Sequence, residues 1–227
     1  MKENYTIVVS EDIYKMNDWQ NNYFDVIVDI GANNGIFVLY AGMRHPQARI
    51  LAYEPCKATY QILQENAWYL NATCFNQALG DGEPLLFHDA GSPCSNLFYK
   101  PGESKLQREG SYSVPSRTLT QIFEENAISG RYLIKMDCEG GERFMLNDES
   151  CVEIIKASQG FCFEVHFPTV RGHAKFKTFP NWHTWNAWIN DNFAITHSIL
   201  YYRSNRRMGH GVYILKNKDI SAERIST

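Results

Sequence analysis

The feature that most constrains the fold is an apolar strand that runs directly into a glycine-rich loop and then into a helix. Residues 24–30 are almost continuously apolar and rich in β-branched side chains, which is typical of a strand buried on both faces. Gly31 and Gly35 enclose a tight loop, and a helical pattern over 36–45 ends before Pro46. A strand, a glycine loop and a helix in this order predict the first unit of a parallel sheet.

Strands and helices alternate along the rest of the chain. Apolar strand patterns recur over 48–53, 72–78, 84–88, 131–137 and 161–167, and helical patterns cover 59–70, 118–126, 141–146 and 182–193. Two strand-like arms near the end, 195–202 and 211–215, are joined by a turn-rich segment. This pattern predicts an α/β fold with a mostly parallel sheet and a C-terminal antiparallel hairpin at its edge.

We interpret residues 1–227 as a single domain. The length suits one core, and no internal repeat or long linker divides the chain. Residues 1–23 are polar and rich in asparagine, and we interpret them as an N-terminal extension. Residues 89–116 are rich in Gly, Ser, Pro and Lys, which predicts a mobile loop or a lid over a ligand site. An ordinary solvated loop is the alternative.

Charge and composition argue against several classes of partner. The formal net charge is −3, and no run of Lys and Arg suggests nucleic-acid binding. The six cysteines form no C-x-x-C pair. The N-terminus carries Glu3, Glu11 and Asp12 and lacks a long apolar run, and no stretch approaches the roughly 20 apolar residues of a membrane helix. We therefore expect a cytoplasmic protein without a nucleic-acid or membrane partner; its oligomeric state stays open.

The composition of the glycine loop indicates the kind of cofactor. A dinucleotide-binding loop has the spacing G-x-G-x-x-G, which lets a pyrophosphate rest on the helix N-terminus. Here Gly31, Asn33 and Gly35 form G-x-N-x-G, and Asp29 precedes them. An acid repels a pyrophosphate but can hold the ammonium group of a cofactor that contains an amino acid. The loop therefore favours S-adenosylmethionine over NAD, with an NAD-dependent oxidoreductase as the alternative.

The ends of the second and third strands carry two further expected contacts. Glu54 follows the second strand, 23 positions after Gly31, where an acid accepts hydrogen bonds from ribose hydroxyls. Gln77 and Ala78 end the third strand pattern, where adenine is commonly held in this architecture. A solvated strand end is the structural alternative for Glu54, and an ordinary turn between strand and helix is the alternative for the glycine loop.

Several segments together resemble the FkbM-type methyltransferases. These are VDIGANNGIF, YEP, NQALGD, VPSRTLTQIF, IKMDCEGGE and FEVHF, in this order. The resemblance covers about residues 26–166, and its most specific element is D-x-E-G-x-E over 137–142. It implies a Rossmann-like class I methyltransferase fold with a seven-stranded sheet. It also implies O-methylation of a hydroxyl on a glycan or a small-molecule natural product.

The resemblance also implies roles for individual residues. Carried over by position, the glycine loop would contact the methionine part, Glu54 the ribose, and Gln77 with Ala78 the adenine. Asn96 stands where the family places a polar loop residue near the cofactor. The residues expected to bind the cofactor are therefore Asp29, Gly31, Asn33, Asn34, Gly35, Glu54, Gln77, Ala78, Asn96 and Asp137.

Polar residues at the ends of two later strands are the candidates for catalysis. Asp137 and Glu139 follow one strand, and Glu164 and His166 end the next; the two-residue spacing places each pair on one face. If these strands are neighbours, three carboxylates and an imidazole meet beside the glycine loop. A hydroxyl acceptor benefits from a general base, for which His166 is the first choice and Asp137 the alternative. Glu139 and Glu164 would orient the base or the acceptor.

Structural roles for the same residues stay open. Glu139 and Glu142 are also suited to the N-terminus of the following helix, and His166 to a hydrogen-bonded structural position. Carboxylates can bind Mg²⁺, but the sequence does not define a coordination geometry, and we expect no metal. A non-catalytic binding module and a methyltransferase acting on RNA or protein are the remaining functional alternatives.

Overall fold

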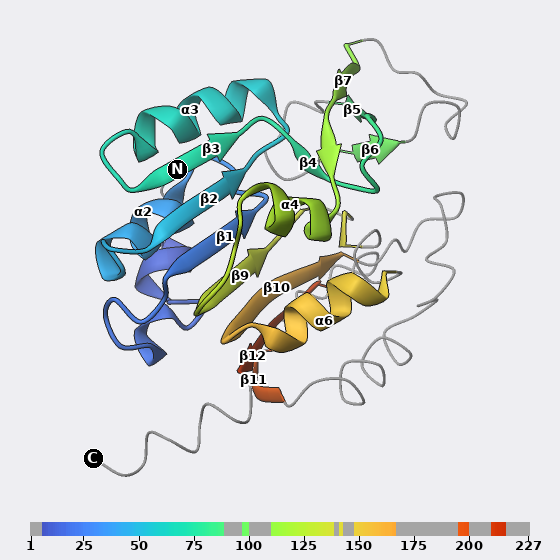
Figure 1. Cartoon of the computed structure of the whole chain (residues 1–227). Coiled ribbons are helices and arrows are strands. Elements are labelled where there is room, and N and C mark those ends of the chain that lie inside the picture. The colour runs from blue at the N-terminus through green and yellow to red at the C-terminus, as the bar shows by residue number, and fades with distance from the viewer. Residues whose placement is uncertain are drawn as a thin grey trace.

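The computed structural model describes residues 6–88, 97–99, 110–138, 141–142, 148–166, 195–199 and 210–216. Its largest sheet has seven strands: β1 (Val26–Ile30), β2 (Arg49–Tyr53), β3 (Ala72–Phe75), β9 (Tyr132–Met136), β10 (Gly160–His166), β11 (Ile195–Ile199) and β12 (His210–Lys216). They lie in the order β11-β12-β10-β9-β1-β2-β3 (Figure 1). The first strand of the chain therefore lies inside the sheet, between β9 and β2.

Five of the strands form a continuous parallel sheet. β1 pairs in parallel with β2 and β9, β2 with β3, and β9 with β10. This arrangement confirms the predicted α/β fold with a mostly parallel sheet. The backbone of β12 runs antiparallel to both β10 and β11, at the edge where the sequence places the hairpin. All carboxyl ends of the parallel strands meet at one edge, where ligands bind in such sheets.

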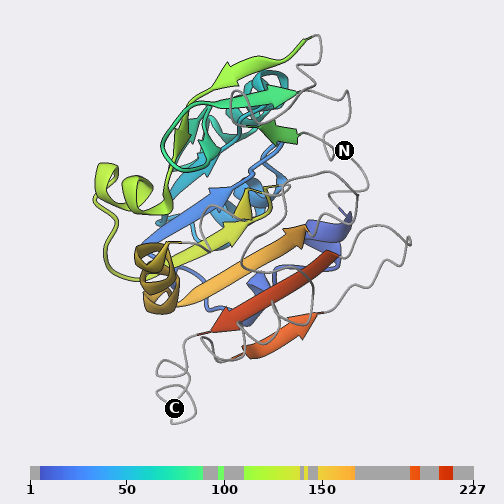
Figure 2. The same ribbon diagram turned by 90° about the vertical axis from the view of Figure 1, so that its right-hand side faces the viewer.

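Helices cover both faces of the sheet and complete two apolar layers. On one face, α2 (Ile36–Arg44) and α3 (Lys57–Ala67) pack with β-strand residues such as Ile27, Ile50 and Leu133. On the other face, α4 (Leu119–Glu125) and α6 (Glu149–Ala157) pack on Val28 and Ile134. Figure 2 shows α4 and α6 together on one side of the strands. The two-residue alternation of β1 and β9 thus supplies both cores.

Local capping explains where the helices of the second face begin. Thr118 and Gln121 form a capping box at the start of α4, and Asp148 accepts a hydrogen bond from the Ser150 N–H at the start of α6. The sequence analysis missed α6, although Asp148 and the i, i+4 pair Cys151 and Ile155 indicate it. The predicted helix over 182–193 and most of the one over 141–146 lie outside the described residues.

The N-terminal segment is part of the core. It contains η1 (Thr6–Ser10) and η2 (Met16–Asp18), and it packs against α2. Tyr14, Met16 and Trp19 are all buried in the α2 layer. Polar residues separate these three side chains in the sequence, so they form no periodic apolar pattern that would predict their burial. Residues 14–19 therefore do more than extend the domain.

Two small sheets lie beyond β3. β4 (Ala78–Leu79) pairs with β8 (Ser116–Arg117), and β5 (Leu85–His88) lies between β6 (Leu97–Tyr99) and β7 (Tyr112–Val114). The prediction of one continuous loop over 89–116 is therefore wrong where β6, β7 and β8 form. Val114 is buried with Leu85 and Phe87, a packing that composition alone does not indicate. Residues 89–96 and 100–109 lie outside the described residues, and the lid stays a prediction.

None of the helices in the described ranges is both long enough and apolar enough to cross a membrane.

Candidate functional site

The glycine loop after β1 is held against the ends of the neighbouring strands. The N–H groups of Gly31 and Ala32 donate to the Tyr53 carbonyl at the end of β2, at 2.9 and 3.0 Å. Gly31 has a φ of +78°, and a Cβ built there would overlap the carbonyl oxygen of Asp137. Only glycine satisfies both constraints. This position therefore brings β1, β2 and β9 together at the carboxyl edge of the sheet.

The remainder of the loop leads into α2 with half-buried polar residues. Asn33 has a φ of +51°, a conformation that asparagine tolerates better than most residues, and its Oδ1 accepts the Asn34 N–H at 2.7 Å. Asn66 of α3 donates to the Asn34 carbonyl at 2.7 Å, and Gly35, with a φ of +84°, precedes the first turn of α2. Asn33 and Asn34 are partly accessible, as their predicted contact with a cofactor requires.

Glu54 fastens the same loop to the end of β2. Its Oε2 accepts the Asn33 N–H and its Oε1 accepts the Cys56 N–H, both at 2.8 Å. The side chain is buried, and this burial raises the pKa of Glu54 to about 7 against the lowering effect of the two backbone donors. The structure thus shows an anchoring role that the sequence analysis missed. Contact with a ribose stays a prediction, for which a carboxylate keeps further lone pairs.

Asp29 pairs with a buried lysine that the sequence analysis did not identify. Asp29 of β1 and Lys135 of β9 are register partners, and Lys135 Nζ lies 3.0 Å from Asp29 Oδ1. The same ammonium donates to the Gly31 carbonyl at 2.8 Å. The pair therefore lies directly beneath the glycine loop. The sequence did contain a signal for this lysine, because Lys135 is the one charged residue in the otherwise apolar strand Y-L-I-K-M.

Electrostatics favour the charged form of this lysine. Although burial lowers the pKa of Lys135, the carboxylates of Asp29 and Asp137 raise it above its ordinary value. Burial raises the pKa of Asp29, against the lowering effect of Lys135. The ammonium also lies 5.6 Å from the ring centroid of Tyr14 and 5.9 Å from that of Phe37, within cation–π range. Because Asp29 is fully buried in this pair, its predicted direct contact with a cofactor requires the surrounding groups to move.

The predicted catalytic strands are neighbours. β9 and β10 pair in parallel, with Met136 opposite Phe163, so the residues that follow them, Asp137 and Glu164, lie on the same face. Both side chains are half-buried, and both carboxylates are close enough to act on the Tyr14 hydroxyl. The strand arrangement that the sequence analysis required for a polar cluster is therefore present.

Three predicted site residues cannot be placed in this cluster. The backbone of His166 ends β10 and pairs with His210, but its side chain lies outside the described part of the structure. Glu139 and Asn96 are outside it entirely. Their assigned roles stay predictions. No group of three potential metal ligands occurs among the residues that the structure describes.

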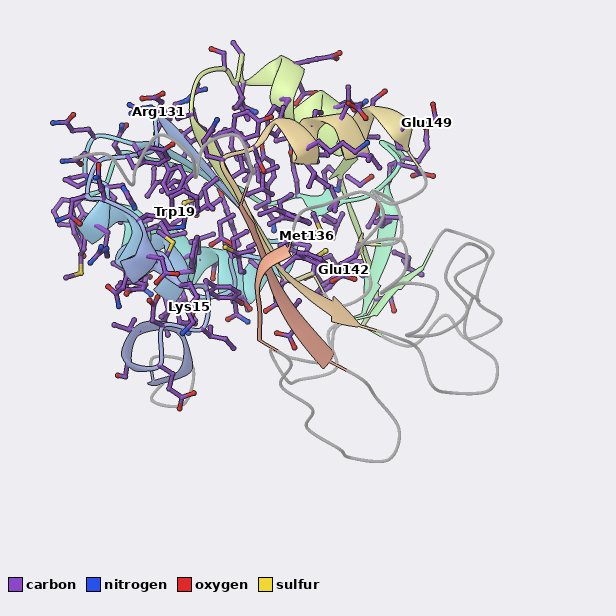
Figure 3. The ribbon with its side chains drawn as sticks, turned by 90° about the horizontal axis from the view of Figure 1, so that it is seen from below. Lys15, Trp19, Arg131, Met136, Glu142 and Glu149 are labelled. Atoms are coloured by element: carbon purple, nitrogen blue, oxygen red, sulfur yellow. The ribbon has the colours of Figure 1, made fainter. Side chains whose placement is uncertain are left out.

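Glu142 is buried and bonds to the local backbone. Its Oε1 accepts the Cys138 N–H at 3.2 Å, directly after β9. Burial, together with this carboxylate and Asp137, raises the pKa of the Cys138 thiol well above its ordinary value. In Figure 3 Met136 and Glu142 lie near one another, whereas Arg131 marks the other end of β9. The alternative interpretation of Glu142 as a structural acid fits this geometry.

Ala78 and Gln77 lie at the start of β4, beyond Glu54. Ala78 is buried, and its N–H donates to the Pro115 carbonyl at 2.9 Å. Gln77 is half-buried, and the neighbouring Asn76 amide donates to the carbonyls of Glu54 and Pro55 at 2.9 Å. This segment therefore stays next to the end of β2. Its contact with adenine stays a prediction.

With this geometry in place, comparison with known proteins identifies the class of the chain. The family model for the methyltransferase FkbM domain matches residues 29–204, most of the sequence. The chain therefore belongs to the FkbM methyltransferase family. This assignment confirms the predicted S-adenosylmethionine-dependent methyltransferase domain and decides against the NAD-dependent oxidoreductase.

Individual relatives agree with the family assignment. Methyltransferase SdnD of Sordaria araneosa is 36% identical over 124 residues, which are 54% of this chain and 46% of that protein. Hexuronic acid methyltransferase AglP of Haloferax volcanii is 25% identical over 156 residues, 66% of this chain and 56% of that protein. The chain thus spans about half the length of these curated relatives.

A solved structure shares the architecture. A SAM-dependent methyltransferase from Leishmania major superposes with a TM-score of 0.50 at 8% sequence identity, covering 95% of this chain and 74% of that one. At this identity the likeness concerns the fold alone.

Proposed function

We propose that this protein transfers the methyl group of S-adenosylmethionine to an oxygen of a glycan or small-molecule natural product. The observation that carries the proposal is the placement of Asp137 and Glu164 on neighbouring strands, on one face and beside the glycine loop. Half-buried carboxylates at this point can bind a polar acceptor and accept its proton. The donor supplies an activated methyl group when bound.

Several residues support a site for the donor. Gly31, Asn33 and Asn34 present backbone at the carboxyl edge of the sheet, and Glu54 fixes the loop from the end of β2. The loop is polar and partly accessible, as an aminoacyl group and a ribose require. We assign these residues, together with Gln77 and Ala78, to cofactor binding.

An oxygen acceptor is supported by the chemistry of one relative. AglP is a hexuronic acid methyltransferase, and hexuronic acids carry hydroxyl and carboxyl oxygens but neither nitrogen nor sulfur. A hydroxyl is a poor nucleophile until it loses its proton, so a general base accelerates its methylation. Asp137 is the base that the described residues offer, and His166 keeps this role as a prediction from the sequence. The net charge of −3 does not favour an RNA acceptor.

The decisive experiment measures donor binding and turnover separately. Calorimetry with S-adenosylhomocysteine should show saturable binding of one molecule per chain. Transfer of a labelled methyl group should then be followed with hexuronic acids, neutral glycans, hydroxylated natural products, RNA and protein. We expect the labelled methyl group to be attached to an oxygen of a sugar or natural product, and not to RNA or protein.

A substitution tests the part that Asp137 takes. The Asp137→Ala variant should fold and lose at least about 100-fold in turnover, the usual contribution of a general base. Asp148→Asn is the matched control, because it removes a carboxylate at the start of α6 without touching the site. A soluble and fully active Asp137→Ala variant contradicts the role of Asp137, and methyl transfer to RNA or protein alone contradicts the acceptor class.

A further inference from the structure

Tyr14 lies at the site although it precedes the matched family region, which begins at residue 29. Its side chain is only 4% exposed, and its hydroxyl donates to Asp137 Oδ2 at 3.5 Å. Its backbone carbonyl accepts a hydrogen bond from Cys162 Sγ of β10 at 3.4 Å. A residue from the start of the chain is therefore placed over the carboxyl ends of β9 and β10.

The tyrosine ring is held from several sides. It meets Phe37 of α2 edge-on, with ring centroids 5.3 Å apart, and the Lys135 ammonium lies 5.6 Å from its centre. These contacts leave the ring little freedom to turn. The direction of its hydroxyl is therefore determined by the packing and not by the bond to Asp137 alone.

The segment that carries Tyr14 is anchored independently of this tyrosine. Asp12 accepts hydrogen bonds from the N–H groups of Met16 and Asn17, at 2.8 and 2.9 Å, and from the Tyr40 hydroxyl at 3.2 Å. Met16 and Trp19 are buried in the α2 layer. Loss of the Tyr14 hydroxyl alone should therefore leave the segment in place.

We propose that residues 12–19 form one wall of the methyl-transfer site, and that Tyr14 is a positioning residue whose hydroxyl holds the Asp137 carboxylate beside the glycine loop. The inference rests on the proposed function, because it concerns residues of the same methyl-transfer site. It concerns a segment that precedes the matched region, residues 29–204.

The physical reason is a competition for Asp137. The Lys135 ammonium attracts this carboxylate, as it attracts Asp29. The Tyr14 hydroxyl offers this carboxylate a second, directional donor, which fixes the orientation of Asp137 in a way that the Lys135 charge alone does not. Burial, then the charges of Asp137, Glu164 and Asp29, raises the pKa of Tyr14 well above its ordinary value, so the hydroxyl stays a neutral donor. The 3.5 Å separation leaves room for this bond to shorten when ligands bind.

The test compares Tyr14→Phe with Tyr132→Phe. Both variants keep a buried ring and remove one hydroxyl that donates a hydrogen bond, but Tyr14 donates to Asp137, whereas Tyr132 donates to the Ile154 carbonyl of α6 at 2.7 Å. We expect Tyr14→Phe to weaken S-adenosylhomocysteine binding about tenfold in calorimetry, because Asp137, which the sequence assigns to the cofactor site, loses the donor that holds it. Tyr132→Phe should change this affinity less than about twofold while lowering the unfolding temperature at least as much.

A second readout does not depend on substitution. Hydrogen exchange of the amides in residues 12–19 should slow when S-adenosylhomocysteine binds to the wild-type protein. If the exchange rates of residues 12–19 do not change on binding, these residues do not form a wall of the site. If wild type and Tyr14→Phe bind S-adenosylhomocysteine with equal affinity, Tyr14 has no positioning role. An equal loss in Tyr132→Phe also overturns this role, because general loosening then explains the effect. A wild-type protein that binds no S-adenosylhomocysteine overturns the proposed function itself, which separates the two failures.

Discussion

Two acid–base pairs join β1 to β9, and they behave in opposite ways. At the amino ends of the strands, the Arg131 guanidinium contacts Asp25 at 2.9 Å, and both side chains are about half exposed. At the carboxyl ends, Lys135 contacts Asp29 at 3.0 Å, and both are buried. Hydrogen bonds from Arg131 lower the pKa of Asp25, whereas burial raises that of Asp29.

The two pairs differ in solvent exposure, and this difference determines how much each pair contributes to stability. Water screens Asp25 and Arg131, so their attraction adds little to stability. The buried pair has lost its hydration, and each charge depends on the other. Lys135 also holds the Gly31 carbonyl, so the same pair links the stability of the sheet to the shape of the glycine loop.

The largest effect that tests this comparison should follow Lys135→Met. This change leaves the Asp29 charge buried without its cation, and we expect the free energy of unfolding to fall by about 3–5 kcal/mol in urea denaturation. S-adenosylhomocysteine binding should be lost as well. The double variant Lys135→Met, Asp29→Asn removes both charges and should recover most of the stability. If the single variant loses less than about 1 kcal/mol of unfolding free energy, the buried pair contributes no more than a solvent-exposed ion pair, and the comparison fails.

Glu54 sharpens the comparison, because it is a buried carboxylate whose two oxygens accept hydrogen bonds from backbone N–H groups. Burial raises its pKa from 4.5 to about 7, so the folded protein keeps a proton that the unfolded chain releases. The stability of the wild type relative to Glu54→Gln should therefore fall as the pH rises from about 4.5 to about 7, by up to about 3 kcal/mol. Urea denaturation of both proteins across this range measures the difference. Parallel pH profiles would contradict the burial argument.

The smallest effect should follow Arg131→Gln at the exposed pair. We expect a loss of about 0.2–1 kcal/mol near neutral pH, reduced further by high salt. Because the folded pKa of Asp25 lies below its ordinary value, its contribution is present at neutral pH and disappears as the pH falls through that folded pKa. Urea denaturation at low and high salt, at neutral and acidic pH, measures this change. A salt-independent loss as large as that of Lys135→Met would break the comparison.

The sequence alone determined much of the framework. Apolar runs and glycines predicted β1, the loop and α2 within a residue or two, because local sterics and burial on both faces leave few alternatives. The two-residue period of a strand and the rule that sites form at carboxyl ends indicated Asp137 and Glu164 as candidates near the ends of their strands. Whether the two strands are neighbours stayed open in the sequence, and the fold supplied that answer.

Only the tertiary structure decided which charges meet. Asp29 and Lys135 are 106 positions apart in sequence, and strand register alone brings them together. Tyr14 reaches Asp137 across a separation of 123 residues, through packing that no local pattern encodes. Pairing, burial and the pKa values that depend on them arise from long-range contacts. The sequence could therefore indicate candidate groups for the chemistry, but the fold had to show which of them are buried and paired.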